Sequence, residues 1–155
     1  MALKVGDTAP AFTLQSSERK EVSLSDYEGK NLLILFFPLA FTGVCTAELC
    51  STRDDIATYQ NLNTDVVAIS VDSNASLARF KEDQRLNFPL LSDFNKDVSR
   101  SFDCLYEDFF GMKGVSKRSA FIVDKDGKIQ YAEVLESAGD LPNFTAIKET
   151  LNNLN

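Results

Sequence analysis

The residue best suited to chemistry in this sequence is Cys45, which follows an apolar run and a short loop containing Pro38 and Gly43. Helix-forming residues begin at Thr46, so we expect Cys45 to lie in the first turn of a helix. Unpaired backbone N–H groups at a helix N-terminus carry about half a positive charge and favour a thiolate over a thiol. Because the thiolate is the nucleophilic form of cysteine, the sequence predicts a reactive sulfur at this position.

Ionisation of a thiol alone does not make a fast enzyme. With a reference pKa of about 8.5, roughly 3% of a free cysteine is thiolate at neutral pH, so full ionisation gains only about thirty-fold in rate. A site built on Cys45 must therefore also stabilise the group that the sulfur attacks.

The absence of histidine narrows the chemistry further. It excludes Cys-His and Ser-His nucleophile pairs, histidine acids and bases, and histidine metal sites. The other two cysteines, Cys50 and Cys104, are not spaced as zinc ligands, and we expect neither a metal nor a cofactor. Three cysteines without an N-terminal signal segment indicate thiol chemistry or packing rather than a disulfide scaffold.

The composition is that of one globular domain spanning residues 1–155, with 44% hydrophobic and 25% charged residues. A formal net charge of −7, without a basic run, argues against nucleic acid or an anionic membrane surface as a partner. No stretch approaches the roughly 18 apolar residues that a membrane span requires, and residues 1–7 do not form an apolar signal segment. We therefore expect a cytoplasmic protein.

The elements that position Cys45 are predicted to be a strand, a tight loop and a helix. Residues 32–37 are consecutively apolar, which is typical of a strand buried on both faces, and the helix is expected to run to about Asn61. Residues 65–71 form a second buried strand. One helix between two buried strands is a βαβ unit, so the two strands should be parallel.

Shorter elements are predicted on either side of this unit. They are an edge strand at 9–14, a pairing segment at 21–24, helices at 75–84 and 96–102, a short strand at 89–92, a loop at 103–117, and strands at 118–123 and 128–134. Asp126-Gly127 predicts a hairpin between the last two strands, and a final helix begins near Asn143. The pattern predicts an α/β fold, a mixed sheet flanked by helices on both faces.

Three segments resemble one family. Pro38-x-x-x-Thr42-x-x-Cys45 is similar to the active-site signature of the peroxiredoxins, which are thiol peroxidases on a thioredoxin-like fold. Residues 5–14 (VGDTAPAFTL) resemble the family's N-terminal segment, and residues 117–124 (KRSAFIVD) resemble the strand that carries its active-site arginine. The run from Cys45 to Cys50 (CTAELC) is most similar to the PrxQ type, also called bacterioferritin comigratory protein, an atypical two-cysteine thiol peroxidase.

The resemblance implies a role for each residue of the signature. Cys45 would be the peroxidatic cysteine, Thr42 would bond the incoming peroxide, and Pro38 would shield the sulfur from water. Arg118 would place positive charge beside the sulfur, and Glu48 would orient that arginine. Simpler interpretations stay open: a packed thiol, a turn or cap threonine, a strand-ending proline, a solvated arginine and an exposed glutamate.

The same resemblance implies that Cys50 is the resolving cysteine. Cys104 is expected to be a packed or incidental thiol and remains the reserve candidate for resolving. Residues five apart on an α-helix are turned by about 140° with Cα atoms roughly 8–9 Å apart, whereas a disulfide needs about 4.4–6.8 Å. We therefore predict that a Cys45–Cys50 bond requires the first turns of the helix to unwind.

The expected function is a thiol peroxidase that reduces hydrogen peroxide and small organic hydroperoxides, with thioredoxin or a similar dithiol protein as reductant. A thioredoxin-like thiol-disulfide oxidoreductase is one alternative, disfavoured because such proteins usually place their cysteines as C-x-x-C. A non-enzymatic redox sensor is the other alternative. We expect a monomer or a weak homodimer.

Overall fold

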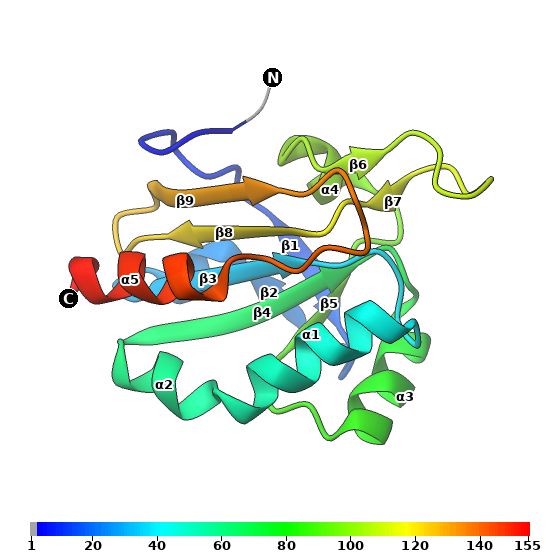
Figure 1. Ribbon diagram of the computed structural model, residues 1–155, viewed down its shortest axis with the longest axis horizontal. Helices are drawn as coiled ribbons and strands as arrows, with labels where there is room; N and C mark the ends of the chain where they lie inside the picture. Colours follow the sequence, from blue (N-terminus) through cyan, green and yellow to red (C-terminus); the bar gives the residue numbers. More distant parts are fainter. Residues whose placement is uncertain (1–2) are drawn as a thin grey trace.

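The fold is built on a seven-stranded sheet in the computed structural model, which describes residues 3–155 (Figure 1). The strand order across the sheet is β2-β1-β5-β4-β3-β8-β9. Its strands are β1 (Thr13–Ser16), β2 (Glu21–Ser23), β3 (Asn31–Phe36), β4 (Thr64–Ser70), β5 (Leu90–Ser92), β8 (Ser119–Val123) and β9 (Ile129–Val134). A separate ribbon pairs β6 (Leu105–Tyr106) with β7 (Val115–Ser116).

The centre of the sheet is β3, in which every residue is buried. The strand has a neighbour on each edge and a packed layer on each face, which is why its sequence is an unbroken apolar run. β4 runs parallel to β3, with Ile34 opposite Val67, and β8 runs antiparallel on the other side. The predicted parallel βαβ unit and the mixed sheet are therefore confirmed.

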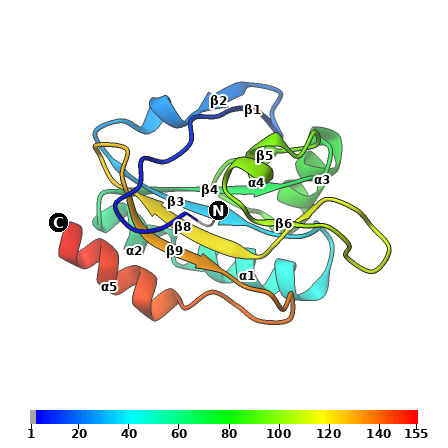
Figure 2. The same ribbon diagram turned by 90° about the horizontal axis from the view of Figure 1, so that it is seen from above.

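Helices lie on both faces of the sheet, as predicted. The helices α1 (Gly43–Asp54), α2 (Ile56–Asn61), α3 (Asn74–Gln84) and α5 (Phe144–Leu154) contribute to the hydrophobic cluster on one face, and the short α4 (Asp97–Ser101) to the cluster on the other. Figure 2 shows α1, α2 and α5 along the same side of β3, β8 and β9. Within residues 3–155, no helix combines the length and apolar character needed to cross a membrane.

The first strand differs from its prediction at residues 9–14. β1 begins only at Thr13, whereas Ala9 and Phe12 are buried in the cluster on the face of α4. The apolar alternation in this segment therefore reflects packing rather than sheet pairing. β1 is also an inner strand, because it pairs with both β2 and β5, and β2 forms the edge before a short 3₁₀ turn, η1 (Leu24–Tyr27).

The helix after Cys45 ends earlier than predicted. α1 stops at Asp54, α2 starts at Ile56, and Asp55 between them has a φ of −97° and a ψ of 7°. Lys148 of α5 donates from Nζ to the Asp55 carboxylate at 2.6 Å, which ties the break to the last helix. No glycine or proline lies near Asp55 to mark the break in the sequence.

The segment 103–117, predicted to be a loop, contains the β6–β7 ribbon. Leu105 pairs with Ser116 and Tyr106 with Val115, and Gly111 in the connecting segment has a φ of +84°. Strands of two residues are too short to show a hydrophobic period, so the sequence did not predict them. The ribbon matters because Tyr106 lines the cavity beside Cys45.

Candidate active site

Cys45 lies in the first turn of α1, as predicted, and its side chain is buried. Thr42 is the residue before the helix and has an extended backbone, and its carbonyl accepts the Thr46 N–H at 2.9 Å. The loop that leads to the helix is held by Asp72, whose carboxylate accepts the Ala40 N–H at 2.8 Å. The helix start, with its unpaired N–H groups, is therefore fixed just beyond the end of β3.

Arg118 contacts Cys45 across 73 residues of sequence. Its Nη2 donates to Cys45 Sγ at 3.2 Å, and its Nη1 donates to Glu48 Oε1 at 2.7 Å. The sheet brings these groups together, because Ser119 pairs with Phe36 and Arg118 therefore lies beside the end of β3. Arg118 directly precedes β8, which is a one-residue correction to the predicted strand at 118–123.

The Arg118 guanidinium is held on three sides. Besides its contacts with Cys45 and Glu48, it donates from Nε and Nη2 to the Ala138 carbonyl at 3.2 and 3.0 Å. Burial acts to lower the pKa of Arg118, but the negative charges of Glu48 and Cys45 outweigh burial and raise it. The side chain is therefore a cation of fixed orientation, with one edge directed at the sulfur.

Glu48 is fully buried one turn after Cys45 and does not have the exposed position of the simpler interpretation. Burial raises the pKa of its carboxyl to about 7, against the opposing attraction of Arg118. Its Oε2 is buried without a hydrogen-bond partner among the described residues. An ion pair in such surroundings is weak evidence for stability, because desolvation offsets much of the attraction between the charges.

A cavity of about 580 Å³ opens beside the sulfur. The residues that line it include Cys45, Pro38, Thr42 and Arg118. The Thr42 hydroxyl donates to the Leu39 carbonyl at 2.7 Å, which leaves its oxygen lone pairs free to accept a bond. Cavities of about 330 and 680 Å³ lie elsewhere, but no cysteine or arginine is among the described residues that line them. We therefore take the cavity at Cys45 as the candidate active site.

The aromatic wall of the cavity was missed by sequence reasoning. It contains Tyr106, Phe109 and Phe110, with the Tyr106 and Phe109 rings stacked 5.0 Å apart. The Tyr106 hydroxyl donates to the Glu136 carbonyl at 3.0 Å, in the segment whose Ala138 carbonyl holds Arg118. A cluster of aromatic residues in an otherwise irregular segment was the available signal, but its position depends on the β6–β7 pairing.

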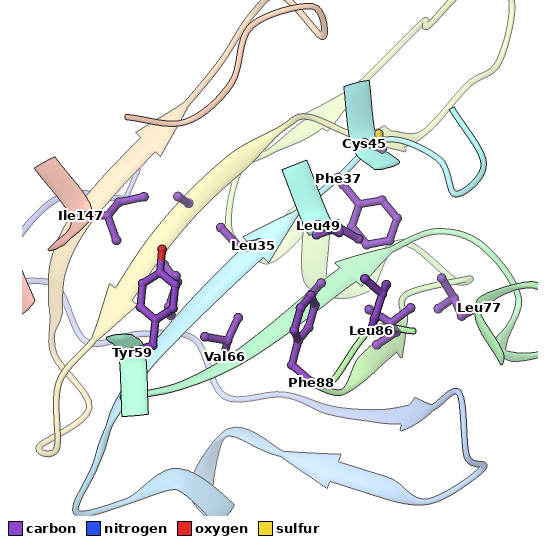
Figure 3. Packing of buried hydrophobic residues seen from close by; sticks show 14 of the residues in the cluster. Leu35, Phe37, Cys45, Leu49, Tyr59, Val66, Leu77, Leu86, Phe88 and Ile147 are labelled. Atoms are coloured by element: carbon purple, nitrogen blue, oxygen red, sulfur yellow. The ribbon is translucent and has the colours of Figure 1, made fainter. Parts of the chain in front are cut away.

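The two remaining cysteines lie outside the cavity, and all three cysteines are free thiols. Cys50 is half-buried on α1, and Cys104 is fully buried in the cluster on the face of α4. Figure 3 shows Cys45 and Leu49 of α1 near Phe37 in the core on the opposite face. Within residues 3–155, no group of three or more cysteine, aspartate or glutamate side chains could hold a metal ion.

Comparisons with known proteins agree on one family. The model of the AhpC/TSA family matches residues 5–132. Peroxiredoxin Bcp of Escherichia coli strain K12 is 38% identical over 131 residues, which cover 83% of this chain and 84% of that protein.

Solved structures give the same result. Peroxidoxin BcpB from Mycobacterium tuberculosis superposes with a TM-score of 0.88 at 28% identity, covering 99% of both chains. A peroxiredoxin-like protein from Aquifex aeolicus superposes with a TM-score of 0.91 at 25% identity, covering 100% of this chain and 90% of that one.

Proposed function

The chain belongs to the AhpC/TSA family of peroxiredoxins, and on that premise we propose that Cys45 is the sulfur with which it reduces hydroperoxides. The fold is thioredoxin-like and the enzyme is a thiol peroxidase. The observation that carries the assignment to Cys45 is the 3.2 Å contact between Arg118 Nη2 and the sulfur, at the wall of an open cavity.

The first step is attack by the Cys45 thiolate on the terminal oxygen of the hydroperoxide. A sulfur–oxygen bond forms, the oxygen–oxygen bond breaks, and the released alkoxide or hydroxide takes up a proton from water. Negative charge spreads over the sulfur and both oxygens in the transition state, and donors aimed at that charge lower the barrier most. Arg118 is the donor in contact with the sulfur, and its orientation is fixed by Glu48 and the Ala138 carbonyl.

Thr42 and Pro38 complete the proposed site. The Thr42 hydroxyl lines the cavity with free lone pairs, so it is placed to accept the hydrogen of an incoming hydroperoxide. Pro38 lines the cavity beside Cys45 and offers no backbone N–H, which supports a role in keeping water from the sulfur. Glu48 does not line the cavity, so its proposed role is to position Arg118.

The second step is condensation of the Cys45 sulfenic acid with the Cys50 thiol, which releases water and forms a disulfide. Both residues lie in α1, which is continuous from Gly43 to Asp54. Because a disulfide needs Cα atoms closer than a five-residue helical spacing allows, this step requires α1 to unwind locally. An external dithiol protein, for which we propose thioredoxin, then returns both cysteines to thiols.

We propose hydrogen peroxide and small organic hydroperoxides as substrates and the cytoplasm as the location. The cavity is large enough to admit an alkyl group beyond the peroxide oxygens. A cycle that ends in reduction by a dithiol protein fits a reducing compartment, where such reductants are maintained.

Peroxide consumption by cysteine variants tests the assignment. The Cys45→Ser variant should consume no peroxide above background, because neither Cys50 nor Cys104 lines the cavity. The Cys50→Ser variant should react once at the normal rate and then stop, because its sulfenic acid is not converted to a reducible disulfide. Mass spectrometry after one equivalent of peroxide should show a Cys45–Cys50 bond in the wild type.

The alternatives give different results in the same experiment. A thiol-disulfide oxidoreductase would reduce a model disulfide faster than peroxide, and a redox sensor would react with peroxide without turnover. Normal peroxide consumption by the Cys45→Ser variant would overturn the assignment of the reactive sulfur.

A further inference from the structure

The C-terminal ends of α1 and α3 are fastened to each other outside the cavity. Arg53 of α1 donates from Nη1 to the backbone carbonyl of Gln84, the last residue of α3, at 2.6 Å. Asn87 donates from Nδ2 to the backbone carbonyl of Arg53 at 3.3 Å. Each contact satisfies a carbonyl in the last turn of a helix, where intrahelical donors run out. We name the group Arg53, Gln84 and Asn87 the helix clasp.

The clasp also holds the Cys50 thiol. Cys50 Sγ donates to Gln84 Oε1 at 3.4 Å, and Arg53 Nη1 donates to the same sulfur at 3.6 Å. Residues five apart in a helix point about 140° away from each other, so this arrangement directs Cys50 toward α3 and away from Cys45. The guanidinium is also well placed at the negative end of the α3 dipole.

One clasp contact exists only while Cys50 is a thiol. The bond to Gln84 Oε1 uses the hydrogen on the sulfur, because a carbonyl oxygen can only accept. That hydrogen is lost when Cys50 forms a disulfide. The reduced protein therefore gains a contact that holds α1 in its helical form, and disulfide formation must break it.

We propose that the helix clasp sets the rate at which Cys50 resolves oxidised Cys45. The proposal rests on the function proposed above, in which Cys45 sulfenic acid and the Cys50 thiol condense to a disulfide and water. A competing reaction with a second hydroperoxide converts the sulfenic acid to a sulfinic acid and releases an alcohol or water. A tighter clasp keeps Cys50 away for longer, and so it lengthens the interval in which overoxidation occurs. Arg53 is accordingly a positioning residue rather than a catalytic one.

The Arg53→Met variant tests this proposal, because methionine keeps the helix and much of the side-chain volume but donates no hydrogen bond. The variant loses the contacts of Arg53 with the Gln84 carbonyl and with Cys50 Sγ, besides the exposed ion pair with Asp54. Loss of these partly exposed, charge-assisted contacts should speed disulfide formation about three- to tenfold. The peroxide concentration that overoxidises half of Cys45 should rise by the same factor. The rate of the first reaction of Cys45 with peroxide should stay unchanged. Rapid quenching with an alkylating reagent, followed by mass spectrometry, measures all three quantities.

Three further variants separate the effect of losing clasp contacts from the effect of a general loss of stability. Arg53→Lys keeps a cation near the Gln84 carbonyl and should restore part of the wild-type delay. Gln84→Leu removes only the side-chain bond to Cys50 and should also speed disulfide formation. Arg79→Met is the matched control, because Arg79 is an exposed α3 residue that pairs with Asp83, and it should leave every rate unchanged.

The outcomes are distinguishable. Unchanged or slower disulfide formation in both Arg53→Met and Gln84→Leu, with a normal first reaction, overturns the clasp proposal and leaves the peroxidase function intact. Absence of any Cys45–Cys50 disulfide in the wild type overturns the proposed resolving role of Cys50 and the clasp proposal together. Faster resolution in both variants, with Arg79→Met like the wild type, supports the proposal.

Discussion

Cys45 and Cys104 are two buried thiols on opposite faces of the same sheet, with very different surroundings. Their exposed fractions are 1% and 0%, so depth does not distinguish them. Cys45 has the Arg118 guanidinium at 3.2 Å and an open cavity beside it. Cys104 lies in an apolar cluster with Phe102 and Phe121, and burial raises the pKa of its thiol to about 12.

At Cys104, burial disfavours the thiolate form of the side chain. A thiol with a pKa of about 12 is thiolate in only about one molecule in 10⁵ at pH 7, and the thiolate is the reactive form. At Cys45 the same low-polarity surroundings contain a fixed cation, and attraction between opposite charges is stronger there than in water. Burial therefore helps reactivity only where the fold also supplies the charge.

Removing the positive charge of Arg118 should produce the largest change in the difference between Cys45 and Cys104. The Arg118→Met variant should lose roughly 10²–10³-fold in the rate of peroxide reduction, the usual effect of removing one donor to a developing negative charge. The variant also leaves Glu48 without its cation, so the double variant Arg118→Met/Glu48→Gln should be measured beside it. Stopped-flow measurement of the first reaction with peroxide gives the rates.

The matched control for this experiment is an arginine near Cys104 in the sequence. Arg100 of α4 is exposed and pairs only loosely with Asp97, at 3.9 Å. The Arg100→Met variant should react with peroxide at the wild-type rate. A rate for folded Arg118→Met within a few-fold of the wild type would show that the contact with Cys45 is structural, and the proposed mechanism would fail.

Local signals allowed the sequence to predict where Cys45 lies, in the first turn of a helix that follows a buried strand. β3 and the start of α1 follow from an apolar run, a proline and a glycine that precede helix-forming residues. Each of these signals determines the structure of only a few neighbouring residues. The contact with Arg118 was expected only from the resemblance to a family. It depends on the register of β8 against β3, which no local pattern specifies.

The features that the sequence did not predict are those set by distant contacts. The break at Asp55 is tied to Lys148 of α5, and the aromatic wall of the cavity depends on the short β6–β7 pairing. The Ala138 carbonyl acts through its backbone, so its side chain gives no signal at all. Glu48 follows Cys45 by one helical turn, but its full burial is set by the packing of the structure, and the sequence left an exposed position open.

The second prediction concerns the pH dependence of stability. The Cys45 site contains a buried carboxyl group, Glu48, in contact with the Arg118 guanidinium. Burial raises the pKa of the Glu48 carboxyl from 4.5 to about 7. The folded state therefore binds this proton more tightly than the unfolded state, and its contribution to stability is greatest below pH 4.5 and is lost as the pH rises to about 7. The loss should be about 3 kcal/mol in the free energy of unfolding.

Chemical denaturation at several pH values measures this effect. The difference in unfolding free energy between the wild type and Glu48→Gln should change across the range from pH 5 to 8, because glutamine does not titrate. The wild type should lose stability relative to the variant as the pH rises. A constant difference would mean that Glu48 is ionised throughout this range, and that it competes with Cys45 for the charge of Arg118.

Cys104 gives the smallest expected effect and completes the comparison. The Cys104→Ala variant should reduce peroxide at the wild-type rate and lose roughly 1–2 kcal/mol of stability, because it removes only a small buried side chain. In the folded wild type at pH 8, an alkylating reagent should modify Cys50 and leave Cys104 unmodified until denaturant is added. A Cys45–Cys104 disulfide after peroxide treatment would contradict this, because the buried thiol would then have to leave the core to act as the resolving cysteine.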